Sequence, residues 1–149
     1  MNDIAAESVP PAAPRPLYTA VATASAGRNG HVESDDGKLS LNVATPRALG
    51  GSGEGTNPEQ LFAAGYAACF GSAVNFLARR QKIVTGEVAV TAQVSLIPAP
   101  TGYSLEVELV VHMPDLPRDQ AEALLRDAHH VCPYSNATRG NIPVRLRLA

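Results

Sequence analysis

Cysteine is scarce in this sequence and tryptophan is absent: among 149 residues, only Cys69 and Cys132 carry a thiol. Two cysteines cannot complete a structural zinc site by themselves, and the four histidines show no recognised ligand spacing with them. The sequence therefore predicts no metal site.

The sequence also has no large excess of one charge. Twelve Lys and Arg stand against fourteen Asp and Glu, which gives a net charge of −2, and no basic block occurs. Nucleic acids and anionic membrane surfaces are bound by clustered Lys and Arg. The composition therefore argues against a nucleic-acid partner and against a protein held on a membrane by charge.

The N-terminal segment shows no export signal. Residues 1–16 hold four prolines among alanine, serine and acidic residues, and they lack a basic segment followed by an apolar one. Such a composition cannot build a core. We therefore expect a disordered leader over residues 1–16, a single domain over residues 17–149, and a cytoplasmic protein.

One long apolar run, residues 61–78, approaches the length of about 18 residues that a membrane span requires. Most of its residues are small, Asn75 interrupts it, and residues 56–60 provide a helix start typical of soluble proteins. The run therefore predicts a buried core helix and no membrane partner.

The remaining patterns predict an α+β domain. Three N-terminal strands are expected first, then a long hairpin over residues 86–113 and a closing strand over residues 142–148. Helical spacing covers residues 57–82 and, as an amphipathic stripe, residues 117–131. The order is βββ-α-ββ-α-β, which lacks the βαβ rhythm of parallel sheets, so we expect antiparallel sheets around a buried central helix.

The first helix has two possible starts. Thr56 and Glu59 fit a capping box, whereas Asn57 fits a cap followed by Pro58 at the first helical position. Either start places Glu59 in the first turn, where the helix dipole favours a carboxylate. Along one helix, Glu59 would lie about 15 Å from Cys69. It could then reach Cys69 only from another subunit or through a distorted helix start.

Each cysteine has two interpretations. A buried cysteine is most often inert, and Cys132 completes an apolar stripe. In a cytoplasmic protein, however, two thiols on helices that cover the same sheet can form a catalytic or sensing pair. A reactive thiolate needs a nearby cation or helix N-terminus, and Cys69 lies in mid-helix. Arg28, in a predicted turn with two glycines, is the candidate cation.

Two blocks of sequence carry a family resemblance. Residues 56–70, TNPEQLFAAGYAACF, and residues 131–141, VCPYSNATRGN, resemble the signature blocks of the organic hydroperoxide resistance (Ohr) proteins of the OsmC-like superfamily. Residues 27–30 and 45–51 are also similar to family segments. The resemblance extends from about residue 17 to the end and implies an OsmC-like fold assembled as an intertwined homodimer.

The resemblance also implies a chemistry. Cys69 would be the peroxidatic residue, oxidised by an organic hydroperoxide to a sulfenic acid, and Cys132 would be the resolving residue that forms a disulfide with it. Arg28 and Glu59 would activate the thiolate and orient the peroxide. Dihydrolipoyl groups on a lipoylated protein would reduce the disulfide, and no bound cofactor is implied.

Aromatic residues on the first helix suggest the substrate class. Phe62, Tyr66 and Phe70, together with Phe76, could line an apolar funnel that prefers alkyl or fatty-acid hydroperoxides over hydrogen peroxide. Core packing is the alternative role for these side chains. The competing hypothesis for the whole protein is a non-catalytic redox sensor, or a ligand-binding protein, that uses the same two thiols.

Overall fold

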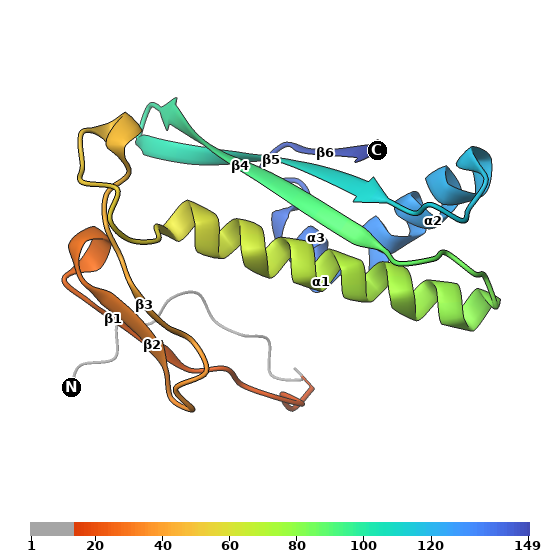
Figure 1. The fold of residues 1–149 in the computed structure, drawn as a ribbon, viewed down its shortest axis with the longest axis horizontal. Coiled ribbons are helices and arrows are strands. Elements are labelled where there is room, and N and C mark those ends of the chain that lie inside the picture. Colours follow the sequence, from red (N-terminus) through yellow and green to blue (C-terminus); the bar gives the residue numbers. More distant parts are fainter. Residues whose placement is uncertain (1–13) are drawn as a thin grey trace.

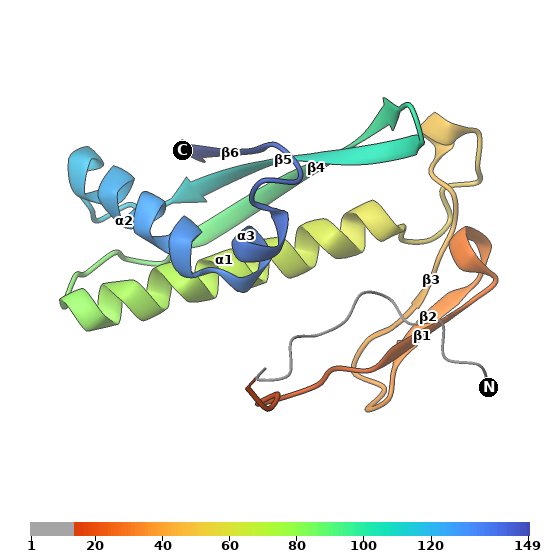
Figure 2. The ribbon, with the colours of Figure 1, turned by 180° about the vertical axis from the view of Figure 1, so that it is seen from behind.

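A computed structural model describes residues 14–149, so most of the predicted leader lies outside the described residues. The N-terminal part of the described chain forms an antiparallel sheet with strand order β1-β2-β3. The strands are β1 (Ala22–Ser25), β2 (His31–Ser34) and β3 (Ser40–Asn42), and the 3-10 turn η1 (Gly27–Asn29) joins the first two. This sheet stands apart from the other sheet (Figures 1 and 2), and none of its strand residues is buried.

The second sheet has the strand order β4-β5-β6. β4 (Ala89–Ala99) and β5 (Gly102–His112) form the predicted antiparallel hairpin, but β6 (Val144–Leu148) runs parallel to β5. The prediction of purely antiparallel sheets is therefore wrong for the last strand. A helical connection carries the chain from the end of β5 back to its middle, where Val144 pairs with Val107, and such a crossover allows parallel pairing.

Three α-helices accompany this sheet. They are α1 (Pro58–Gln81), α2 (Arg118–Val131) and α3 (Pro133–Thr138), while the 3-10 turn η2 (Arg47–Leu49) lies in the loop before α1. The long α1 runs along the sheet, with α2 and α3 beside it (Figures 1 and 2). α3 replaces the first part of the loop predicted for residues 134–141, and residues 139–141 form a turn. Pro133 both ends α2 and occupies the first position of α3, where its missing N–H costs nothing.

The start of α1 follows the second of the two predicted capping patterns. The Asn57 side chain accepts a hydrogen bond of 2.9 Å from the backbone N–H of Gln60, and Pro58 is the first helical residue. The Thr56 hydroxyl instead donates to the Gln60 side chain. The helix start is therefore regular, and Glu59 occupies an ordinary first-turn position.

The core lies between this sheet and the helices. Val107, Leu109 and Val111 of β5 are buried on the face toward the helices, and their β6 partners are Val144, Leu146 and Leu148. α1 contributes Tyr66, Phe70 and Val74 to the same core, and α2 contributes Leu124, Leu125 and Ala128. The predicted amphipathic faces of β5 and α2 are thus confirmed.

The opposite face of α1 is uncovered. Gln60, Ala64, Ala68, Ser72 and Phe76 form an exposed stripe at four-residue spacing. Among the described residues, α1 is long and apolar enough to cross a membrane, and 28% of its apolar window is buried within the chain. The predicted central helix is therefore buried on one side only.

Candidate active site

The two cysteines lie side by side as free thiols. Their sulfur atoms are 3.6 Å apart, although 63 positions separate them in the sequence. Cys132 is fully buried, whereas Cys69 is partly exposed. A disulfide requires about 2.05 Å between the sulfurs, so a small approach would join them. Cys69 is the thiol that a molecule from solvent can meet first.

The junction between α2 and α3 presents Cys132 to the middle of α1. Cys132 has an extended backbone (φ −65°, ψ 122°) between the two helices. Its N–H donates to the Ala128 carbonyl of α2, and its carbonyl accepts from the Asn136 N–H of α3, both at 2.9 Å. Both main-chain groups of Cys132 are therefore fixed, and its thiol is held close to Cys69.

The surroundings of Cys69 within one chain oppose ionisation. Burial raises the pKa of the Cys69 thiol, the backbone N–H of Tyr134 lowers it, and the neighbouring Cys132 thiol raises it again. The net direction is upward, which disfavours the thiolate. A reactive thiolate at this position requires a cation from elsewhere.

An apolar pocket opens beside Cys69. It has a volume of about 350 Å³ and is lined by Cys69, Ser72, Ala73, Phe76, Val131 and Pro133. Apart from the thiol and one hydroxyl, these side chains offer no polar group. The pocket fits the alkyl or aryl part of a small organic molecule better than it fits a small hydrated molecule such as hydrogen peroxide.

Arg28 and Glu59 form the second predicted pair. Two parallel hydrogen bonds join them, Nη1 to Oε2 at 2.9 Å and Nη2 to Oε1 at 2.6 Å. Hydrogen bonding to Arg28 holds the pKa of the Glu59 carboxyl below its usual range, and Glu59 raises the pKa of Arg28. Gly30 shapes the turn that carries Arg28, since a Cβ there would lie 1.9 Å from the Ser25 carbonyl oxygen. The sequence thus builds a charged, fixed pair at the start of α1.

The structure assembles each pair but does not join one pair to the other. Within residues 14–149, no hydrogen bond or ion pair links Arg28 or Glu59 to either cysteine. α1 begins regularly, so about 15 Å of undistorted helix separates Glu59 from Cys69. The sequence left two ways for Glu59 to reach Cys69. The regular helix start excludes a distorted one, which leaves contact from another subunit.

Replacing Glu59 with Gln should lower stability in a pH-dependent way. Because the pKa of Glu59 is lowered on folding, its ion pair stabilises the fold above the ordinary glutamate pKa. This contribution disappears as the pH falls through the lowered value. Since Arg28 is 38% exposed, the difference from wild type should be at most about 1 kcal/mol at pH 7.

Urea unfolding at several pH values measures this difference. Glu122→Gln is the matched control, because it breaks the exposed ion pair with Arg118 at the surface of α2. A Glu59→Gln penalty that stays unchanged at acid pH, where the Glu59 carboxyl is protonated in both the folded and the unfolded chain, would show that the ion pair is not its source.

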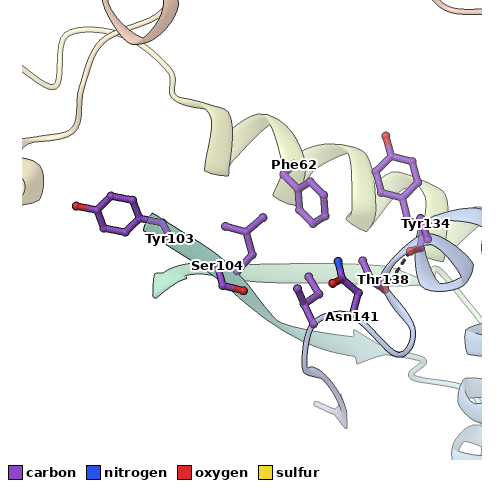
Figure 3. A pocket seen from close by; sticks show the side chains of 9 residues that line it. Phe62, Tyr103, Ser104, Tyr134, Thr138 and Asn141 are labelled. Atoms are coloured by element: carbon purple, nitrogen blue, oxygen red, sulfur yellow. Dashed lines mark hydrogen bonds between the residues drawn. The ribbon is translucent and has the colours of Figure 1, made fainter. Parts of the chain in front are cut away.

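The aromatic residues predicted to bind substrate occupy different environments. Tyr66 and Phe70 are fully buried in the core, so a substrate could touch them only if the core opened. Phe62 lines a larger pocket of about 640 Å³ between α1, β5 and α3 (Figure 3). That pocket is also lined by Tyr103, Ser104, Leu105, Tyr134, Ala137, Thr138, Asn141 and Ile142. Of the four aromatic residues predicted to line a funnel, Phe62 lines the larger pocket and Phe76 lines the pocket beside Cys69, while Tyr66 and Phe70 line neither.

Tyr134 is a site residue that the sequence analysis missed. Its side chain lines the larger pocket, while its backbone N–H faces the Cys69 sulfur. The ring packs over Gly65, where a Cβ would come within 2.8 Å of the phenol oxygen, and lies 5.6 Å from the Tyr66 ring. Its place two residues after Cys132 in a signature block was the available signal. In the described residues, no cluster of three or more His, Cys, Asp or Glu side chains could hold a metal ion.

Comparison with known proteins assigns this chain to a family. The model of the OsmC-like proteins matches residues 51–147, which include both cysteines and most of the β4-β5-β6 layer. The chain belongs to the OsmC-like family. Within the family it is 50% identical over 135 residues to the organic hydroperoxide resistance protein of Xanthomonas axonopodis pv. citri, covering 89% of this chain and 95% of the relative. It is 48% identical to OhrB of Bacillus subtilis, covering 89% and 98%.

Solved structures place this OsmC-like chain in the same fold. A Legionella pneumophila organic hydroperoxide resistance protein superimposes with a TM-score of 0.88 at 54% identity, covering 91% of this chain and 99% of that one. A Vibrio cholerae relative, solved with captopril in one of its active sites, gives 0.86 at 50% identity and covers 90% and 93%. The predicted family and the predicted OsmC-like α+β fold are both confirmed.

Proposed function

We propose that this OsmC-like protein acts in organic hydroperoxide resistance as a thiol peroxidase. The observation that carries the proposal is the pair of free thiols 3.6 Å apart, one partly exposed beside an apolar pocket and the other buried. The names of its relatives support the substrate class. The proposed products are an alcohol and a Cys69–Cys132 disulfide.

The proposed reaction has two steps. The Cys69 thiolate attacks the terminal oxygen of ROOH, the O–O bond breaks, and the departing alkoxide takes a proton to become an alcohol. Cys69 is left as a sulfenic acid. The Cys132 sulfur then attacks Cys69, the S–O bond breaks, and the hydroxyl leaves as water with the thiol proton. The two electrons that reduce the peroxide come from the two thiols.

Activation of Cys69 is proposed to come from a second copy of the chain. The exposed stripe of α1 and the uncovered β1-β2-β3 sheet both lack a partner within the described chain. An intertwined homodimer would cover them and would place Arg28 and Glu59 of one subunit against Cys69 of the other. The guanidinium would then lower the pKa of the thiol that burial raises.

The proposed reaction also needs a reductant and a cellular compartment. We propose that dihydrolipoyl groups of a lipoylated protein reduce the disulfide, and that the protein works in the cytoplasm without a nucleic-acid partner. The partly exposed Cys69 sulfur is the accessible point of attack for such a dithiol. A redox sensor using the same two thiols is the alternative function, since a reactive thiol pair also serves that role.

Turnover measured with different peroxides and reductants tests the proposed function. With dihydrolipoamide present, cumene or fatty-acid hydroperoxide should be reduced at least about tenfold faster than hydrogen peroxide, because the pocket beside Cys69 buries the organic group. Thioredoxin and glutathione should support lower rates than the dithiol. Oxidation of the thiols without steady-state turnover by any reductant would favour the sensor, and equal rates with both peroxides would contradict the apolar pocket.

A further inference from the structure

A buried hydrogen-bonded network lies behind the thiol pair. The Tyr66 phenol oxygen is 2.9 Å from the Ser135 hydroxyl and 3.2 Å from the Thr138 hydroxyl. The Ser135 hydroxyl is also 2.9 Å from Nδ1 of His129. Tyr66 and Ser135 are fully buried, and Thr138 is 5% exposed. Such closely spaced polar groups inside a core fix the elements that carry them.

The network connects the three helices that carry the two cysteines. Tyr66 lies three residues before Cys69 on α1, while His129 and Ser135 lie three residues before and after Cys132. Tyr66 thus ties α3 to α1 just after the buried thiol, and the His129–Ser135 bond ties the end of α2 to α3 across it. We call this network of Tyr66, His129, Ser135 and Thr138 the clamp. Arg139 adds a second tie, since its guanidinium donates to the His129 carbonyl and to the Asn136 side chain.

The clamp matters because the sulfurs must still approach each other. They stand 3.6 Å apart, and a disulfide needs about 2.05 Å. Cys132 is fully buried, so its thiol meets oxidised Cys69 only if the junction stays seated on α1. A junction that loosens would leave the Cys69 sulfenic acid exposed to a second peroxide molecule.

We propose that Tyr66, Ser135 and His129 are positioning residues that hold Cys132 against Cys69 and so set the rate of disulfide formation. In the peroxide reaction this role rests on the proposed function, but the clamp itself acts on any oxidised form of Cys69. The network uses no group that touches the peroxide, so its loss slows the second step and leaves the first unchanged.

Reaction with glutathione disulfide measures how well the network holds Cys132 against Cys69, and it needs no peroxide. Cys69 attacks glutathione disulfide and releases one glutathione, and Cys132 then displaces the second glutathione to close the internal disulfide. At equilibrium, the ratio of internal disulfide to glutathionylated Cys69, multiplied by the concentration of free glutathione, gives the effective concentration of Cys132. Tyr66→Phe, which keeps the ring but removes the hydroxyl, should lower this concentration at least about twofold, because the hydroxyl's contacts with Ser135 and Thr138 are both lost.

Ser135→Ala, which removes the centre of the network, should lower the effective concentration at least as much as Tyr66→Phe. Ser95→Ala, at an exposed position on the outer face of β4, is the matched control and should leave the effective concentration unchanged. A melting temperature lowered in Tyr66→Phe with an unchanged effective concentration would overturn the proposal, because a merely stabilising network predicts that result.

The peroxide arm uses the same variants. At a fixed dose of cumene hydroperoxide, Tyr66→Phe should lose its Cys69 thiol as fast as wild type but form more sulfinic acid, detected by mass spectrometry of the Cys69 peptide. An unaltered yield of sulfinic acid would overturn the role in peroxide turnover. A wild-type Cys69 that does not react with cumene hydroperoxide would refute the proposed function, while the glutathione measurement would still decide the role of the clamp.

Discussion

Replacing Cys69 with serine is expected to reduce hydroperoxide turnover to the uncatalysed level. The hydroxyl of serine is a far weaker nucleophile than a thiolate and cannot form a sulfenic acid or a disulfide. Cys132 cannot substitute for Cys69, because its side chain is fully buried. Turnover of cumene hydroperoxide with dihydrolipoamide measures the loss, and circular dichroism checks that the variant is folded.

Cys132→Ser is the matched control, because it removes the second thiol and leaves the first. It should consume one equivalent of organic hydroperoxide rapidly and then accumulate sulfinic acid on Cys69 instead of the internal disulfide. Measurable turnover by Cys69→Ser would show that Cys69 is not the nucleophile. The same conclusion would follow if Cys132→Ser failed to consume the first equivalent of hydroperoxide.

Replacing Arg28 with alanine is expected to raise the pKa of Cys69 and to slow its oxidation by about 100-fold, the typical cost of losing one preorganised charge-stabilising group. The reason is the environment of Cys69, which raises the thiol pKa within one chain and offers no cation among the described residues. Thiolate absorbance against pH measures the shift. An unchanged titration would remove Arg28 from the site.

Mixing two variants tests whether the proposed homodimer shares Arg28 between its subunits. In a dimer of one Cys69→Ser chain and one Arg28→Ala chain, a site shared between subunits leaves one intact Cys69 facing one intact Arg28. Random mixing of equal amounts should then restore about a quarter of wild-type activity, because half of the dimers are mixed and each holds one working site. No recovery would show that each chain builds its own site, since every chain would then carry one defect.

Local sequence signals predicted much of the fold. Asn57 and Pro58 mark the start of α1, and the alternation in β5 and the stripe of α2 define their buried faces. α3 was missed because its residues, PYSNAT, are mostly turn formers, and Pro133 is read as a helix stop. The parallel pairing of β6 was missed because alternation identifies a strand but not the direction of its neighbour.

The candidate site was predicted through the family resemblance more than through local pattern. Spacing alone could not show that Cys69 and Cys132 meet, because their contact depends on how the α2–α3 junction sits on α1. Nor could spacing separate Phe62, which lines a pocket, from Tyr66 and Phe70, which belong to the core. All three lie on one helical stripe, and burial along that stripe depends on which elements cover it.

Mass spectrometry of the reduced protein after one equivalent of cumene hydroperoxide tests whether Cys69 and Cys132 reduce the peroxide together. Within one turnover, both thiols should be lost, each chain should yield one cumyl alcohol, and a single new bond should join the Cys69 and Cys132 peptides. Two free thiols and unreacted hydroperoxide at the end of the same incubation would contradict joint reduction by the two cysteines.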